Sequence, residues 1–88
     1  MSEAIIDRIR KAGAGLRGFK PKGVSMDTLV TDKEATGLDS IGRVELTLAL
    51  EEELGVTIGD EELDGIKTFG DLVALLEGKA HVHRALSA

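Results

Sequence analysis

The sequence predicts an all-α fold: a four-helix bundle with a long loop between its first two helices and a short third helix. Strand signals are weak, because the chain has only two aromatic residues and few runs of β-branched residues. Several windows instead repeat apolar residues at helical spacing, and glycines follow them where helices would end. A chain of 88 residues forms one small core. We therefore expect one domain over residues 1–78 and a flexible tail over residues 79–88.

The first helix is predicted to begin after Ser2 and to weaken at the glycines of "GAGLRG", Gly13 to Gly18. Its expected buried positions are Ile5, Ile6, Ile9, Ala12 and Leu16. The glycine spacing matches a dinucleotide fingerprint, but that motif needs a strand before it, so we interpret it as a helix end. A loop of about twenty residues follows, and we expect Leu29 and Val30 to anchor it to the core.

The second helix is predicted from Ser40 to Leu54, with Gly55 as its stop. At 100° per residue its apolar positions fall into two opposite stripes. One stripe is Leu46, Leu50 and Leu54; the other is Ile41, Val44 and Leu48, with Glu45 and Glu52 on the same side. Either the long loop covers the second stripe, or that stripe is exposed and docks a basic, partly apolar partner.

The last two helices are predicted from their ends. A short helix spans Asp60 to Leu63 and stops at Gly65. Thr68 and Asp71 then have the spacing of a capping box, and Gly78 stands where the final helix should end. The expected buried positions of that helix are Phe69, Leu72, Val73 and Leu76.

Charge and composition exclude several classes of function. The chain carries a net charge of −5, and residues 34–78 alone carry −10, which disfavours binding to nucleic acid. Cysteine is absent, so the chain has no thiol nucleophile of its own. No apolar run is long enough to cross a membrane or resembles a signal peptide, so we expect a cytoplasmic protein without membrane contact.

Catalytic and metal-binding residues are not predicted. His81 and His83 could coordinate a metal ion, but two ligands without a nearby carboxylate or cysteine make a poor metal site. The predicted bundle contains no histidine, and its acids lie on helix surfaces where they stay ionised. We therefore expect a protein that is not an enzyme.

Ser40 lies in "GLDSIGRVEL" at the start of the second helix. Serine and aspartate are both favoured N-cap residues, so the Asp39-Ser40 pair is explained by capping alone. A hydroxyl in the first turn of a helix also suits an attached phosphate, because unpaired N–H groups and the positive end of the helix dipole are close. Both interpretations remain open at this point.

The stretch "GLDSIGRVELTLALEEELGVTIGDEELDGIKTFGDLVALL", Gly37 to Leu76, closely resembles the acyl carrier protein family. The resemblance implies a carrier domain in which Ser40, beside Asp39, receives 4'-phosphopantetheine from coenzyme A through a separate Mg²⁺-dependent transferase. The arm's thiol would then hold acyl cargo as a thioester. It also implies that basic patches of partner enzymes dock on Ile41, Val44, Glu45, Leu48 and Glu52.

The resemblance leaves the pathway open. We expect a monomeric acyl carrier for fatty-acid or polyketide-type biosynthesis, served by a phosphopantetheinyl transferase and by acyl-loading, synthase or transferase enzymes. An aminoacyl or peptidyl carrier, or an unmodified helical adaptor, would share the frame. Gly42 is unfavourable in a first turn by up to about 1 kcal/mol, so we expect either tolerance in a frayed turn or room for an approaching enzyme.

Overall fold

This computed structural model describes the backbone of residues 2–87 and the side chains of residues 4–79. Within that part of the chain there are five α-helices and one short 3₁₀-helix. In chain order they are α1 (Ser2–Gly13), η1 (Pro21–Gly23), α2 (Lys33–Thr36), α3 (Ser40–Leu54), α4 (Asp60–Asp64) and α5 (Phe69–Ser87). Within residues 2–87 the only β-type pairing is an isolated bridge between Leu29 and Thr68. The all-α prediction is confirmed, with a short α2 inside the predicted loop.

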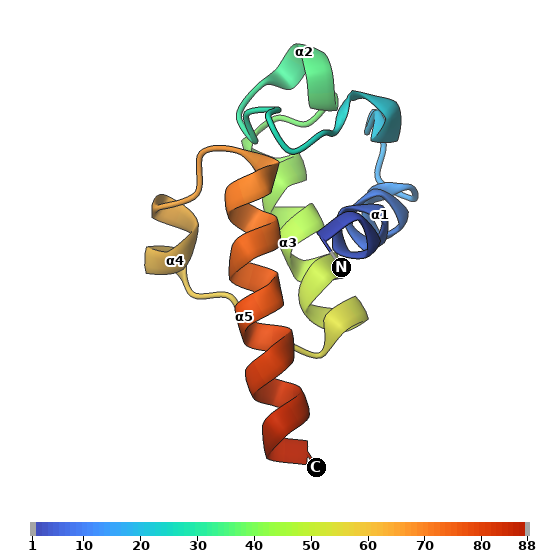
Figure 1. Ribbon diagram of the computed structural model, residues 1–88. Coiled ribbons are helices and arrows are strands. Elements are labelled where there is room, and N and C mark those ends of the chain that lie inside the picture. The colour runs from blue at the N-terminus through green and yellow to red at the C-terminus, as the bar shows by residue number, and fades with distance from the viewer. Residues whose placement is uncertain (1, 88) are drawn as a thin grey trace.

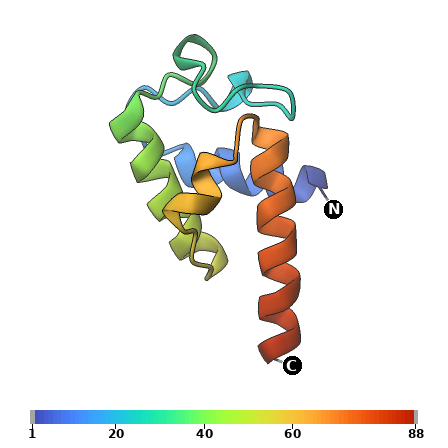
Figure 2. The same cartoon turned by 90° about the vertical axis from the view of Figure 1, so that its left-hand side faces the viewer.

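The helices are arranged around a pair that runs in the same direction. Helices α3 and α5 both begin at the end of the molecule covered by the long loop, and α1 packs against both of them (Figures 1 and 2). Helix α4 lies on the connection that returns the chain from the end of α3 to the start of α5. The starts of α3 and α5 therefore lie at the same end of the molecule, on opposite sides of it in Figure 2.

The core takes apolar side chains from every long helix. Its buried members are Ile6, Ile9, Val24, Leu38, Leu46, Leu50, Ile58, Phe69, Leu72, Val73 and Leu76. The four positions predicted for the last helix are all buried. Ile5 and Ala12 of α1 pack partly buried against the core, and so does Leu16, which lies in the turn after α1 and not in the helix. Spacing of i, i+3, i+4 and i+7 thus identified the inward face of α5 correctly.

Helix α5 begins as predicted but does not end at Gly78. The Thr68 Oγ1 accepts a hydrogen bond from the Asp71 N–H at 3.1 Å, and Asp71 Oδ2 accepts one from the Thr68 N–H at 3.1 Å, which completes the capping box. The helix then continues through Gly78 to Ser87. The predicted stop is wrong because a single glycine costs a helix only about 1 kcal/mol. The alanine, arginine and leucine residues in the segment after Gly78 also favour helix. Flexibility of residues 79–88 stays a prediction.

The long loop is held by two buried residues that differ from the predicted anchors. Val24 and Leu38 are buried, whereas Val30 is only partly buried and Leu29 is exposed. Backbone bonds also tie the loop to the start of α5: the Val30 N–H donates to the Lys67 carbonyl, and the Phe69 N–H donates to the Thr28 carbonyl, each at 2.9 Å.

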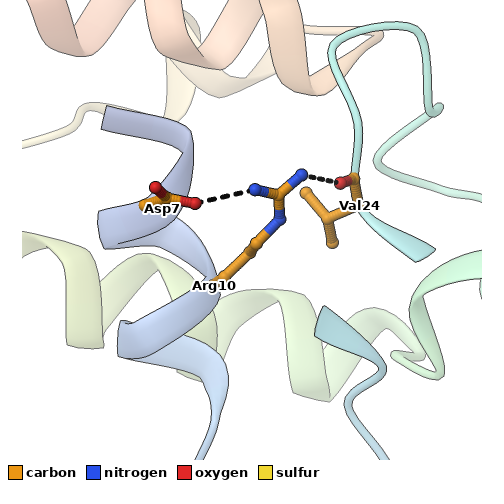
Figure 3. A network of polar contacts seen from close by, with 3 residues as sticks. All are labelled: Asp7, Arg10 and Val24. Atoms are coloured by element: carbon orange, nitrogen blue, oxygen red, sulfur yellow. Dashed lines mark hydrogen bonds and ion pairs between the residues drawn. The ribbon is translucent and has the colours of Figure 1, made fainter. Parts of the chain in front are cut away.

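Arg10 fastens the loop to α1. Its guanidinium donates to the Val24 carbonyl at 2.7 Å and pairs with Asp7 at 2.8 Å, so one side chain bridges the helix and the loop (Figure 3).

No helix within residues 2–87 has the length and apolar character needed to span a bilayer.

Candidate functional site

The chain enters α3 through a tightly bonded turn. Helix α2 ends at Gly37, whose φ of 74° is a left-handed conformation that favours glycine. The buried Thr36 hydroxyl then donates to the Asp32 carbonyl at 3.0 Å and accepts from the Leu38 N–H at 3.1 Å. Leu38, 2% exposed, is thereby fixed in the core just before α3 starts. Neither Thr36 nor Leu38 was predicted from the sequence, although an apolar residue between Gly37 and Asp39 is a signal for an anchor.

Asp39 is the N-cap of α3. Its Oδ1 accepts a hydrogen bond from the Gly42 N–H at 2.8 Å. This bond lowers the pKa of Asp39, and the positive charge of nearby Lys33 lowers it further. The carboxylate is therefore ionised at neutral pH. Of the Asp39-Ser40 pair, Asp39 is the residue that caps α3.

Ser40 is the first residue of α3, and it is exposed. Since Asp39 supplies the cap, the Ser40 hydroxyl is not needed for it. The hydroxyl makes no hydrogen bond to any residue in the part of the chain that the structure describes. An accessible, unengaged hydroxyl at a rigid helix start fits a covalently attached phosphoryl group, because such a group needs an open approach and a fixed support.

A cavity of about 460 Å³ opens beside Ser40, between α3, α4 and the start of α5. Its floor is apolar and includes Leu38, Leu46, Leu50, Leu63, Phe69 and Leu72. Polar side chains on the lining are Thr31, Ser40, Arg43, Thr47 and Asp64. The space is large enough for a small apolar group, and a molecule attached to Ser40 would start at its lining. Helical periodicity does not reveal such a space, because it forms between helices.

The second stripe of α3 is exposed. Ile41 is 68% exposed, Val44 60% and Leu48 56%, whereas Leu46 and Leu50 on the opposite stripe are 4% and 1% exposed. Glu45 and Glu52 are exposed on the same side as the second stripe. The alternative in which the loop covers this stripe is therefore wrong, and an apolar strip with acidic neighbours remains on the surface beside Ser40.

The glycine motif does not line this cavity. The glycines of "GAGLRG" end α1 and form the turn after it, as predicted. His81 and His83 lie outside the residues whose side chains the structure describes.

Comparisons with known proteins agree on one family. A family described as "Phosphopantetheine attachment site" matches residues 25–76. The acyl carrier protein of Petrotoga mobilis is 41% identical over 73 residues, covering 72% of this chain and 86% of the relative. The acyl carrier protein of Rhodococcus erythropolis is 32% identical over 75 residues, covering 85% of this chain and 80% of the relative.

The family match over residues 25–76, a range that includes all of α3, defines a protein of the phosphopantetheine-bearing class. Within that class, the chain belongs to the acyl carrier protein family. Its cofactor is 4'-phosphopantetheine.

Proposed function

We propose that Ser40 is the attachment site and that the chain holds acyl groups as thioesters on the arm, for fatty-acid or polyketide-type biosynthesis. The observation that carries this proposal is the free, exposed hydroxyl of Ser40, which Asp39 leaves without a capping role. The chain lacks cysteine, so the arm supplies the sulfur for the thioester. The chain itself is not a catalyst but a substrate of other enzymes.

Attachment changes one bond at Ser40. The Ser40 oxygen bonds to the phosphorus nearer the pantetheine, and a base of the transferase takes up the hydroxyl proton. The phosphoanhydride bond of coenzyme A breaks, and adenosine 3',5'-bisphosphate leaves. A phosphodiester then joins the arm to α3. The proposed partners are a phosphopantetheinyl transferase and acyl-loading, synthase or transferase enzymes with basic patches. They would dock on the exposed stripe of Ile41, Val44, Glu45, Leu48 and Glu52, here called the docking stripe.

The cavity supports an acyl cargo over an aminoacyl one. Its floor is built from leucines and Phe69, where a hydrocarbon chain would gain contacts. An ammonium group placed on that floor would lose its hydration, and Asp64 is the one carboxylate among the lining residues that could offset its charge. The proposal also includes a monomeric, cytoplasmic protein with its carrier domain in residues 1–78.

Intact mass spectrometry tests the attachment. Incubation with coenzyme A, Mg²⁺ and a broad-specificity phosphopantetheinyl transferase should add the mass of one phosphopantetheine to the wild type and nothing to Ser40→Ala. Ser25→Ala is the matched control, because Ser25 is another exposed serine but is bonded to Thr28 in the loop.

Ser40→Ala should keep its circular dichroism spectrum, because the cap is made by Asp39. A mass gain that survives in Ser40→Ala would move the attachment elsewhere. A folded wild type that gains no mass would favour the unmodified adaptor.

A further inference from the structure

Arg43 is a cation of α3 without a partner. It makes no side-chain hydrogen bond or ion pair with any residue whose side chain the structure describes. Arg8 pairs with Glu53 at 3.2 Å, and Arg10 bridges Asp7 and Val24 (Figure 3). Arg17 also makes no ion pair within the described side chains, but it is exposed to solvent in the turn after α1. Arg43 is also only partly exposed, so it differs from a fully solvated surface cation.

The helix places Arg43 next to Ser40. Residues three apart on a helix are neighbours on one face, and helical side chains lean toward the N-terminus. Arg43 therefore leans toward the turn that holds Ser40. Both residues line the same cavity. A group that is attached to the Ser40 oxygen and extends along that cavity would therefore run beside Arg43.

The charges around Ser40 leave Arg43 available for a new anion. Asp39 already carries a negative charge, which is offset by the Gly42 N–H and by Lys33. A phosphodiester on Ser40 would add a second negative charge one residue away from Asp39. Between residues 34 and 78 the only cations are Arg43 and Lys67, and Lys67 lies at the start of α5.

We propose that Arg43 binds the phosphodiester of the arm on Ser40 and so holds the first bonds of the arm against the cavity. This rests on the proposed attachment at Ser40. A guanidinium presents paired N–H donors that match two phosphate oxygens, which an ammonium group cannot do. Arg43 is thus a positioning residue: it takes no part in forming the bond, and it orients the arm once the bond exists.

The test compares apo and holo forms of four proteins: wild type, Arg43→Gln, Arg43→Lys and Lys11→Gln. Lys11 is an exposed cation on α1 that makes no ion pair in the described part of the chain, so Lys11→Gln controls for the loss of one charge. Each protein is modified to completion and checked by intact mass. Melting temperatures and ³¹P NMR spectra of both forms are then recorded at low salt and in 1 M NaCl.

The stabilisation that the arm confers, taken as holo minus apo melting temperature, should be about 1–4 °C smaller in Arg43→Gln than in wild type. Arg43→Lys should fall between them, and Lys11→Gln should match wild type. In 1 M NaCl the difference should shrink. The ³¹P resonance should shift in Arg43→Gln and not in Lys11→Gln.

Equal holo minus apo differences and equal ³¹P shifts in wild type and Arg43→Gln would overturn the role of Arg43. Failure of wild type to gain mass would instead overturn the attachment at Ser40. The two results are read from different measurements, so they are distinguishable.

Discussion

Packing explains why position 42 is a glycine, and composition alone does not reveal this reason. A Cβ atom at this position would lie 3.0 Å from Leu38 Cδ2 and 3.2 Å from Leu38 Cβ. Leu38 is buried and held by Thr36, so it has little freedom to move aside. The missing side chain thus lets the first turn of α3 close over Leu38, which is a third explanation beside fraying and enzyme access.

Gly42→Ala should therefore fall short of the usual gain from replacing a helical glycine. Relief of backbone entropy stabilises a helix by roughly 0.5–1 kcal/mol. Contact with Leu38 should cancel most of it. Urea unfolding gives the change in unfolding free energy, which we expect to lie near zero.

Gly78→Ala is the matched control, because a Cβ atom at Gly78 in α5 meets nothing within 4 Å. It should show the full stabilisation of about 0.5–1 kcal/mol. If both variants gained equally, the contact with Leu38 would not matter.

At the scale of the element, four helices begin with a carboxylate that accepts a backbone N–H. At the start of α2 it is Asp32, which accepts the Ala35 N–H at 3.1 Å. The other three carboxylates lie at the starts of α3, α4 and α5. Asp39 accepts the Gly42 N–H at the start of α3, Glu62 accepts the Gly59 N–H at the start of α4, and Asp71 accepts the Thr68 and Lys67 N–H groups at the start of α5. These backbone bonds lower the pKa of all three carboxyl groups. The pKa of Glu62 is lowered further by Lys79, which pairs with it at 2.9 Å.

Stability should therefore fall in acid. Each carboxyl group has a folded pKa below its ordinary value, which is 3.8 for aspartate and 4.5 for glutamate. The folded state thus holds fewer protons than the unfolded state in this range, so the contribution is complete above about pH 5. It is lost as the pH falls through 4 toward the folded pKa values. Thermal melts at pH 7, 5, 4 and 3 measure this decline.

The triple variant Asp39→Asn, Glu62→Gln and Asp71→Asn tests the cause. Each amide oxygen can still accept the backbone N–H, but it no longer titrates in acid. Its melting temperature should decline less between pH 5 and pH 3 than that of wild type. An unchanged decline would assign acid sensitivity to other groups.

At the scale of the whole molecule, charge is divided between regions. Residues 1–33 carry a net +3, whereas residues 34–78, which contain α3 and α4, carry −10. The docking stripe lies in the acidic region beside Ser40, so a basic partner would be steered toward the residue where we propose that the arm is attached.

Reversing two charges of the docking stripe should slow the transferase. Glu45→Lys with Glu52→Lys removes attraction at the site where we propose that partners dock. We expect kcat/KM for modification to fall by roughly 3- to 30-fold at low salt, and its salt dependence to flatten. Stopped-flow or mass-detected initial rates at several NaCl concentrations measure both effects.

Asp27→Lys with Glu34→Lys is the control, because both residues are exposed and the change in net charge is the same. It should slow modification much less. Equal losses in the two double variants would attribute the effect to net charge and remove the docking stripe from the proposal.

Features that depend on near neighbours in the chain can be predicted from the amino-acid order alone. The capping box at Thr68 and Asp71 and the glycine after Leu54 are local signals, and both mark helix ends in the structure. The frame around Ser40 likewise identified the family, because its residues are close together in the chain. The helix end predicted at Gly78 was wrong, because a glycine that a helix tolerates and a glycine that ends a helix cannot be distinguished from the sequence alone.

Features that depend on packing between distant segments become visible in the folded chain. The two stripes of α3 are equivalent by periodicity, and contact with α1 and the rest of the core buries Leu46 and Leu50 while Ile41 and Leu48 stay exposed. The role of Leu38 beneath Gly42 and the cavity beside Ser40 also arise between elements. Local sequence specifies which residues can form a helix with an apolar face. Which face is buried depends on partners that only the folded chain brings together.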